Sequence, residues 1–510
     1  MAGRPADGGE LSSKTVEPSS ASTAFARGAR SGIIAALMAR TSRNTSLRAL
    51  PSVDALLRHP LLVDVLASVP RALVVEAVRA EVASARGAAG RKAAISAEDI
   101  AGLAARRARL ASTPQLVRVL NATGIVLHTN LGRSPFSEPA RKAIEEVARG
   151  YSSLEFDIAT GKRGSRGSGV EAWLKRLTGA EAAVVVNNGA AAILLALSAL
   201  ASGTRVIVSR GELVEIGGLF RIPDVMEKSG ARLLEVGTTN RTHLRDYERA
   251  LEKHDNVGAI LRVHPSNFRI AGFTARPEVP ELAALARRHK VQLIEDLGSG
   301  ALIDLATLGL ESEPTVRESL TAGCDVVTFS GDKLLGSSQA GLVLGRKRLV
   351  DRIRRDPLAR ALRVDKLTLA ALEATLPAYL DPDRAKEEIP ALAMLHTPPD
   401  ILERRARQVA ATLARLAPEL RLDVVRGDGE VGGGALPVTR LPGFVVTLED
   451  PERTAVELET LARSAVPPVI GYIRERRFRL DVRTLTDLEA DEAAHTIARA
   501  RAMRAGTERE

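Results

Sequence analysis

Between residues 182 and 330 the chain alternates short β-branched runs with Ala- and Leu-rich segments of helical spacing. The runs are AAVVV (182–186), RVIVS (205–209), ARLLEV (231–236), AILRV (259–263), VQLIED (291–296) and DVVTFS (325–330). Strands that are apolar along their whole length are typical of a parallel sheet covered by helices on both faces. We therefore expect an α/β fold with a mostly parallel central sheet.

The segments outside this region differ in composition and periodicity. A chain of 510 residues is too long for one compact core, so two or three domains are expected. Apolar recurrence at helical spacing precedes residue 115, and the strand candidates GFVVTL and RFRLDV lie near the end. The predicted parts are a disordered N-terminal extension (1–30), a basic helical domain (31–115), a large α/β domain (116–385) and a small C-terminal α+β domain (386–510).

Positive charge is concentrated near the N-terminus. Residues 1–110 hold 16 Lys and Arg against 9 Asp and Glu, a net charge of +7, whereas the whole chain carries +10. A basic segment attached to a larger body indicates a polyanionic partner, nucleic acid before membrane. A generally arginine-rich composition is the alternative explanation.

The cysteine content and the hydropathy limit the compartment. The single cysteine, Cys324, excludes an internal disulfide and a cysteine-rich metal site. The most apolar long stretch, residues 182–201, is interrupted by Asn187-Asn188-Gly189, and the N-terminus has no apolar core of the signal-peptide type. We expect a cytoplasmic protein with no metal site and no membrane or DNA partner.

Lys333 stands three residues after the end of the apolar run DVVTFS, in FSGDKLLG (329–336). Ligands of open α/β sheets bind beyond the carboxyl ends of the strands, where this lysine is expected to lie. A lysine shielded from bulk water has a lowered pKa and becomes a nucleophile that can form a Schiff base with an aldehyde. An ordinary surface lysine after a strand is the alternative.

Three further features indicate pyridoxal phosphate as the aldehyde. Asp296 ends the strand VQLIED and could pair with the protonated ring nitrogen of the cofactor, or cap a helix instead. The turn at Asn188, Gly189 and Ala190 joins a strand to a helix, whose first backbone amides suit a phosphate. Ser330, three residues before Lys333, could bind the same phosphate.

The order of these features is that of fold-type I pyridoxal phosphate enzymes. The phosphate turn comes first, then the aspartate, then Ser-x-x-Lys. His264 and Asn267, in RVHPSNFRI, end the strand before the aspartate strand. We expect them to hydrogen-bond the phenolic oxygen of the cofactor or to stack on its ring, and a capping role is the alternative for each.

Six longer strings resemble one family, the bacterial L-seryl-tRNA(Sec) selenium transferases, also called selenocysteine synthases. The resemblance runs from about residue 47 to residue 485. The strings are NATGIVLHTNLGRSP (121–135), ELVEIGGLFRIPDVMEKSGARLLEVGTTNRTH (212–243), VHPSNFRIAGF (263–273), IEDLGSG (294–300), FSGDKLLG (329–336) and LARALRVDKLT (358–368).

The resemblance implies a fold, a reaction and partners. The fold would be that of fold-type I transferases, like aspartate aminotransferase. Lys333 matches the cofactor lysine of the family, and Arg133, Arg360 and Arg363 match arginines of the selenophosphate site, where guanidinium groups suit phosphate-like oxygens. The N-terminal helical domain would hold the specific tRNA. The family also implies a ring built from dimers, a decamer.

The reaction implied is conversion of L-seryl-tRNA(Sec) to L-selenocysteinyl-tRNA(Sec), by elimination of the seryl hydroxyl and addition of selenium. One alternative is a related lyase or aminotransferase that acts on a free small amino acid. Another is a tRNA-binding protein without catalysis. Three stretches depart from the family pattern: Gly167-Ser168-Gly169, where an aromatic residue and a histidine are usual, NNGAAA (187–192), where NNNAAA is more common, and Ser337-Ser338, where Gly-Pro is usual.

Overall fold

The computed structural model describes residues 50–88, 96–216 and 220–507. The chain consists of two compact units, residues 1–117 and 118–510. The predicted disordered extension (1–30) and the first part of the predicted helical domain (31–49) lie outside the described residues. No helix within the described ranges is long and apolar enough to cross a membrane.

Helices make up the described part of the first unit. They are α2 (Val53–Leu57), α3 (Pro60–Leu66), α4 (Arg71–Ala88) and α5 (Ala97–Ser112). Leu56, Leu62 and Ile100 are fully buried between them, so this unit has its own hydrophobic core. Ser96 starts α5 with a capping box, because its hydroxyl accepts from the Asp99 amide at 3.0 Å and the Asp99 carboxylate accepts from the Ser96 amide at 3.1 Å.

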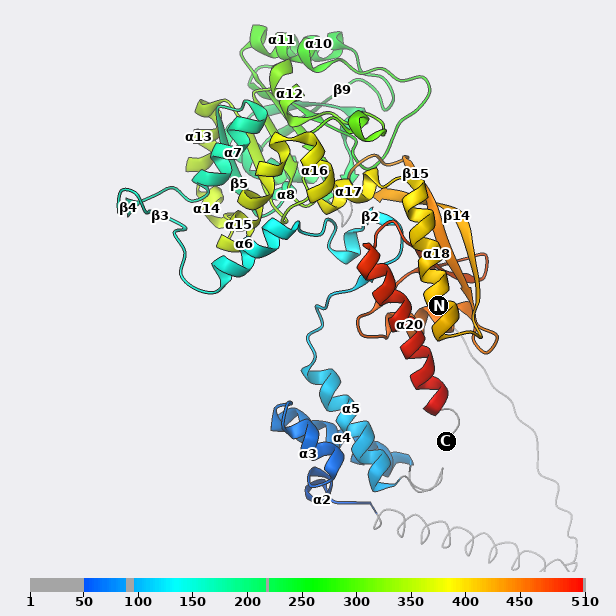
Figure 1. Ribbon diagram of the computed structural model, residues 1–510. Helices are drawn as coiled ribbons and strands as arrows, with labels where there is room; N and C mark the ends of the chain where they lie inside the picture. Colours follow the sequence, from blue (N-terminus) through cyan, green and yellow to red (C-terminus); the bar gives the residue numbers. More distant parts are fainter. Residues whose placement is uncertain (1–49, 89–95, 217–219, 508–510) are drawn as a thin grey trace, which may run out of the picture. The chain divides into compact units, whose positions relative to one another are not determined.

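A seven-stranded sheet forms the centre of the second unit (Figure 1). Its spatial order is β5 (Ala182–Val186), β13 (Gly341–Gly345), β12 (Val326–Ser330), β11 (Gln292–Gly298), β10 (Val257–Val263), β6 (Arg205–Ser209) and β9 (Arg232–Val236). Each of the six predicted strands is present, and the mostly parallel α/β fold is confirmed. Strand β13 was not predicted, and it is antiparallel to both of its neighbours.

Helices cover both faces of this sheet. One face packs against α7 (Ser168–Thr178), α10 (Leu244–Lys253), α11 (Val279–His289) and α12 (Val316–Ala322). The other face packs against α8 (Gly189–Ala201), α9 (Ile222–Lys228) and α13 (Lys347–Arg355). Burial on both faces explains why the strands are apolar along their whole length.

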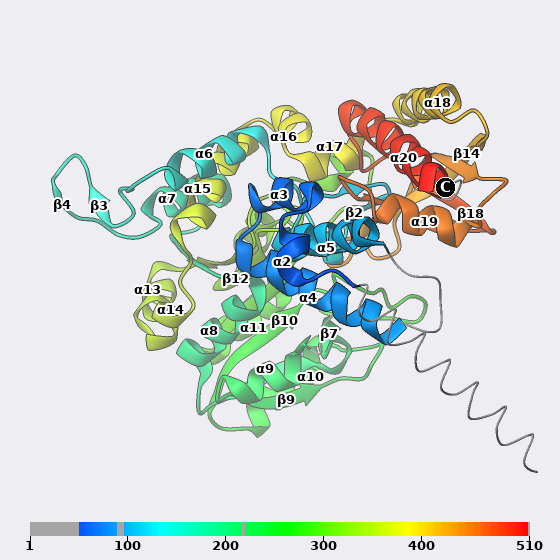
Figure 2. The same cartoon turned by 90° about the horizontal axis from the view of Figure 1, so that it is seen from below.

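A second sheet lies in the C-terminal part of this unit. Its order is β17 (Tyr472–Arg474), β18 (Arg477–Asp481), β15 (Arg440–Glu449), β14 (Arg421–Gly432) and β2 (Ile125–Leu127). The strand candidates GFVVTL and RFRLDV lie in β15 and β18. Helices α18 (Pro399–Leu416), α19 (Ala455–Arg463) and α20 (Asp487–Thr507) pack on it, and Figures 1 and 2 show α18 and α20 side by side.

The remaining elements are short connections and small pairs. Both views show the β3–β4 hairpin extending away from the central sheet. The helical connections are η1 (Thr129–Leu131), α6 (Glu138–Ala148), η2 (Arg210–Glu212), η3 (Leu305–Leu308), α14 (Pro357–Ala361), α15 (Lys366–Thr375), η4 (Leu376–Leu380), α16 (Pro382–Glu388) and α17 (Pro390–His396). The paired strands are β1 (Leu120–Asn121) with β16 (Val469–Ile470), β3 (Phe156–Asp157) with β4 (Lys162–Arg163), and β7 (Glu215–Ile216) with β8 (Phe220–Arg221).

Candidate active site

Lys333 lies in a buried turn that joins β12 to the antiparallel strand β13. Its side chain is only 4% exposed. The turn is held by backbone bonds from the Gly331 amide to the Ala340 carbonyl at 2.9 Å and from the Leu334 amide to the Ser299 carbonyl at 3.1 Å. A lysine in a rigid, buried turn is not the surface lysine that was the alternative.

The surroundings of the Lys333 amine favour its neutral form. Burial and the nearby Arg133 guanidinium lower the pKa of Lys333, against the opposing charges of Asp296, Asp332 and Glu313. A Cβ atom at Gly434 would lie 2.6 Å from Nζ, so only glycine leaves room beside the amine. The Lys333 side chain thus packs closely against the Gly434 backbone, and its neutral amine is suited to attack on an aldehyde.

Asp296 points from β11 toward the same end of the sheet. It stands in register with Thr328 of β12, whose hydroxyl donates to Oδ1 at 2.9 Å. Burial raises the pKa of Asp296, while the Thr328 bond and the charge of Lys333 oppose the rise. A cationic group beside this carboxylate would restore its ionised form, since an opposite charge at close range lowers the pKa of a carboxyl group.

The predicted phosphate turn meets Ser330 directly. Asn188 caps α8, because its Oδ1 accepts from the Ala191 amide at 2.8 Å. The amides of Gly189 and Ala190 are in the first turn of α8, where amides have no partner inside the helix. A Cβ atom at Gly189 would lie 2.4 Å from the Ser330 hydroxyl, so this hydroxyl lies against the start of the helix. Amides and hydroxyl together suit a phosphate.

His264 and Asn267 differ in their placement. The His264 amide donates to the Asp296 carbonyl at 2.9 Å, and its Nε2 lies 2.9 Å from Glu313 Oε1. Asn267 Nδ2 donates to the Glu215 carbonyl at 3.1 Å, while its Oδ1 is buried without a hydrogen-bond partner in the described part of the chain. His264 therefore lies beside the Asp296 site. Ring stacking and phenolic-oxygen binding stay predictions for both residues.

The three predicted arginines divide between two places. Arg133 Nη1 forms an ion pair with Asp332 at 2.9 Å, next to Lys333. Arg133 also has a positive φ of 61°, which a side-chain-bearing residue adopts only at a cost. Arg360 and Arg363 instead line a cavity of about 530 Å³ that does not include Lys333, together with Arg163, Arg166, Arg354 and Arg355.

A bound pyridoxal phosphate fits these residues. Lys333 supplies a primary amine, the first amides of α8 and Ser330 supply phosphate donors, and a cation beside the buried Asp296 carboxyl would favour its ionised form. Strands β5, β12 and β11, which position these groups, belong to the seven-stranded sheet, whereas Gly434 reaches Lys333 from the loop after β14 of the five-stranded sheet. These residues are among those that the sequence predicted for this cofactor, and their roles in binding it stay predictions.

Comparison with known proteins assigns the family. Residues 119–486 match the family described as L-seryl-tRNA selenium transferase, and residues 47–86 match one described as selenocysteine synthase N terminal. The chain belongs to the L-seryl-tRNA selenium transferase family. The predicted family resemblance is confirmed.

Curated relatives match along nearly their whole length. The L-seryl-tRNA(Sec) selenium transferase of Nitratidesulfovibrio vulgaris is 50% identical over 475 residues, which cover 90% of this chain and 99% of that protein. The enzyme of the same name from Geobacter sulfurreducens is 50% identical over 446 residues, 86% of this chain and 96% of that protein.

A solved structure supports the fold. The structure of D-glucosaminate-6-phosphate ammonia-lyase superposes with a TM-score of 0.52 at 19% identity, covering 76% of this chain and 96% of that chain. At this identity the likeness concerns the fold alone. The predicted fold-type I transferase class is confirmed.

The structure explains one departure from the selenium transferase pattern. Ser337 and Ser338 are buried, and their side chains bind α15: the Thr375 hydroxyl donates to Ser337 Oγ at 3.1 Å, and Ser338 Oγ donates to the Thr368 carbonyl at 3.1 Å. The two serines thus anchor the lysine turn to a helix by side-chain hydrogen bonds, which the usual Gly-Pro pair cannot form.

Sequence reasoning missed several residues of this family member's site. They are Thr328, Asp332, Glu313 and Gly434 around Lys333, and Glu155 in the arginine cavity. Glu155 accepts from Arg166 Nε and from Arg163 Nη2, both at 2.9 Å. Only Thr328 had a usable signal, since its side chain falls on the same face of its strand as Ser330.

Proposed function

We propose that the chain converts L-seryl-tRNA(Sec) to L-selenocysteinyl-tRNA(Sec), with selenophosphate as the selenium donor. Membership of the selenium transferase family, together with the buried Lys333 beside Asp296, carries this proposal. The runner-up is a lyase acting on a free amino acid. It is disfavoured because the relatives named L-seryl-tRNA(Sec) selenium transferase match both units of the chain.

Pyridoxal phosphate, when bound, withdraws electrons from the α-carbon of the attached amino acid, so that the α-proton and then the β-hydroxyl can leave. Lys333 Nζ accepts the α-proton as the general base, and its lowered pKa keeps more of the amine neutral. The Asp296 carboxylate would hold the proton on the ring nitrogen. Ser330 and the first amides of α8 would hold the phosphate.

Three arginines are proposed to bind the selenium donor. Arg133, Arg360 and Arg363 bind oxygens of selenophosphate, because planar guanidinium groups form paired bonds with such oxygens. Arg360 and Arg363 line a cavity separate from Lys333 within this chain, so a second copy could bring the two together. We propose a dimer-based ring, a decamer, in the cytoplasm. Light scattering of the purified protein measures the mass.

Conversion in vitro tests the function. Seryl-tRNA(Sec), selenophosphate and the protein loaded with pyridoxal phosphate are expected to give selenocysteinyl-tRNA, identified by mass spectrometry of the released amino acid. Turnover of free serine without any requirement for tRNA would reject the proposal in favour of the lyase.

Replacing Arg363 with alanine is expected to raise the KM for selenophosphate about tenfold or more, with little change in the KM for seryl-tRNA. The reason is that a lost guanidinium–phosphate contact weakens binding of the anion alone. Steady-state kinetics with each substrate varied in turn measure the split. Arg232→Ala, at an exposed arginine of β9, is the matched control. An equal change in both KM values would contradict the assignment.

The N-terminal unit is proposed to bind the tRNA. Arg106 and Arg109 of α5 line a shallow cavity with Leu61 and Leu110. If both arginines contact phosphates, the double change to serine is expected to make the negative slope of log K against log salt shallower by about 2. The reason is that each phosphate contact contributes about 1 to its magnitude. Filter binding over a salt series measures it.

Arg107→Ser serves as the control for that experiment. Its guanidinium already pairs with Glu81 at 2.6 Å on the neighbouring helix. A slope unchanged by the double substitution would place the tRNA contacts elsewhere.

A further inference from the structure

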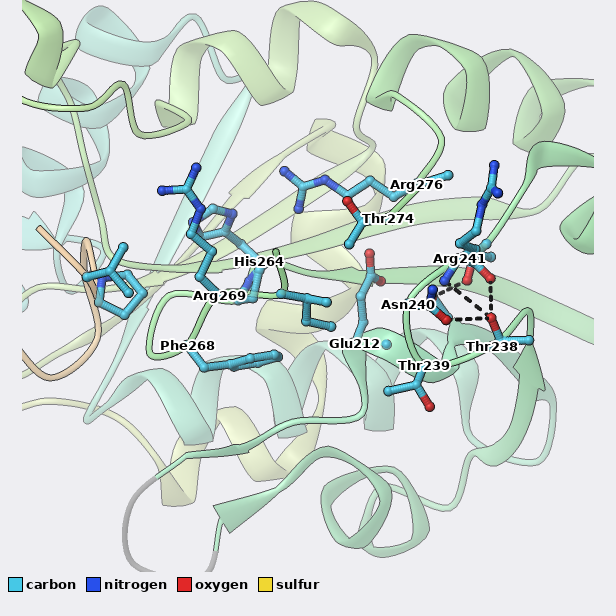
Figure 3. Close-up of a pocket in the computed structure, with 18 of the residues that line it drawn as sticks. Glu212, Thr238, Thr239, Asn240, Arg241, His264, Phe268, Arg269, Thr274 and Arg276 are labelled. Carbon is cyan, nitrogen blue, oxygen red and sulfur yellow. Dashed lines mark hydrogen bonds between the residues drawn. The ribbon is translucent and has the colours of Figure 1, made fainter. Parts of the chain in front are cut away.

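A cavity of about 390 Å³ lies beyond the carboxyl ends of β6, β9 and β10 (Figure 3). Its size falls in the range of small-molecule sites. None of the roles assigned so far uses this cavity except through His264. The lining comes from Ser209, Gly211 and Glu212, the turn Thr238–Thr242, His264 and Pro265, the segments 268–270 and 274–276, Glu311–Glu313 and Leu436–Val438.

This cavity begins where the lysine site ends. Gly434 lies against the end of the Lys333 side chain, since a Cβ atom there would be 2.6 Å from Nζ, and two residues further along the same loop Leu436 lines the cavity. His264 and Glu313, bonded to each other at 2.9 Å, also line it. The charge of Glu313 acts on Lys333, and that of His264 acts on Asp296. A substrate whose reacting carbon lies beside Lys333 could therefore extend into this cavity.

The substrate of the proposed reaction has a large group at that position. In seryl-tRNA the serine carbonyl is esterified to the ribose of the 3′-terminal nucleotide. Only the carbonyl carbon and the ester oxygen separate the reacting α-carbon from that ribose. When the α-carbon is beside Lys333, the terminal ribose and base must lie in the adjoining space. Unpaired RNA ends are commonly held by aromatic stacking and by hydrogen bonds to the base edge.

The cavity offers both kinds of contact. Phe268 presents an aromatic ring at one side, with Arg269 next to it (Figure 3). On other sides lie Glu212 and Arg276, whose guanidinium charge acts on the Glu212 carboxyl. The Arg276 guanidinium so placed suits the phosphate that precedes the terminal nucleoside, whereas Arg269 Nη1 is bound to the Glu311 carboxylate at 3.1 Å.

Glu212 is the least expected group in this lining. It is 7% exposed, and its Oε2 accepts from the Val263 amide at 3.2 Å. Burial raises its pKa to about 7, against the Val263 bond and the charges of Arg262 and Arg276. A carboxyl group that carries a proton offers one donor and one acceptor, and the edge of adenine offers an amine donor beside a ring-nitrogen acceptor.

We propose that this cavity binds the 3′-terminal nucleoside of the aminoacylated tRNA, with Phe268 stacking on the base and Glu212 bonded to its edge. The inference rests on the proposed function, because it places the end of that substrate. It adds a subsite that discriminates seryl-tRNA from free serine. Phe268 and Glu212 bind substrate there without joining the chemistry at Lys333.

Substitution of Phe268 tests the stacking contact. Phe268→Leu keeps an apolar side chain of similar volume but removes the ring, whereas Phe268→Tyr keeps the ring. Phe268→Leu is expected to raise the KM for seryl-tRNA about tenfold, since stacking on an aromatic side chain supports base binding at this scale. The KM for selenophosphate and the visible absorbance of the bound cofactor should not change, and Phe268→Tyr should restore the KM.

A small probe tests the site without turnover. Adenosine 5′-monophosphate is expected to bind the cofactor-loaded full-length protein in isothermal titration, and Phe268→Leu and Glu212→Leu are expected to weaken that binding at least fivefold. In the wild type it should compete with seryl-tRNA and not with selenophosphate.

The two readouts separate the possible failures. If the wild type forms no selenocysteinyl-tRNA yet binds the nucleotide in a Phe268-dependent way, the proposed function fails and the nucleoside site stands. If conversion proceeds while Phe268→Leu leaves the KM for seryl-tRNA unchanged, or the nucleotide competes with selenophosphate instead, the nucleoside site is wrong.

Discussion

Replacing Lys333 with alanine is expected to abolish selenium transfer and the visible absorbance of the bound cofactor together. The Lys333 amine can join an aldehyde covalently, and it is also the proposed base for the α-proton. Loss of both roles should lower kcat by at least about 10⁴-fold, the upper range for a single acid–base group. Absorbance spectra and the conversion assay measure the two effects.

Lys142→Ala provides the matched control for this result. Lys142 is an exposed lysine of α6 whose side chain lies 3.5 Å from Glu138, so its loss should change neither the spectrum nor the rate. Circular dichroism should show that both variants are folded. A Lys333→Ala protein that keeps the visible band would show that the cofactor is held elsewhere.

Replacing Asp296 with asparagine is expected to lower kcat at least about 100-fold while the cofactor stays attached to Lys333. An amide has nearly the shape of the carboxylate and can still accept the Thr328 bond, but it carries no charge to keep the ring nitrogen protonated. Loss of one preorganised electrostatic contact typically has this magnitude. Rates and spectra of the loaded variant give the two readouts.

The surface change Asp255→Asn, also a loss of one carboxylate, should leave the rate within about twofold, because exposed charges are screened by solvent. If Asp296→Asn retained full kcat, the carboxyl group would have a structural role, and the ring nitrogen would need another partner. A variant that lost the cofactor entirely would indicate that Asp296 contributes mainly to binding.

Local pattern was sufficient for most of the central sheet. The runs at β5, β6, β9, β10, β11 and β12 are apolar and β-branched because helices bury both of their faces, so each could be read from its own residues. Strand β13 was not predicted because its sequence GLVLG is short, contains two glycines and follows the lysine turn directly. Its assignment depends on pairing with β5 and β12 and on no property of its own.

Lys333, Asp296, Ser330 and the turn at Gly189 could be predicted because each follows or ends a recognisable strand. The neighbours that set their chemistry could not. Thr328 meets Asp296 across two strands, and Gly434 meets Lys333 from about a hundred residues further along the chain. The arginine cavity likewise joins Glu155 and Arg166 to the Val364 carbonyl, which Arg166 Nη1 binds at 2.7 Å.

The sequence by itself determined the family, the fold class and the lysine. These depend on the hydropathy period and on the order of the motifs, and both can be read from the sequence alone. The tertiary structure decided how strongly that lysine is buried, that Ser337 and Ser338 anchor its turn, and that a second cavity adjoins it. Those properties arise where distant segments meet. Burial and electrostatic neighbours depend on distance in space, and spacing along the chain does not specify it.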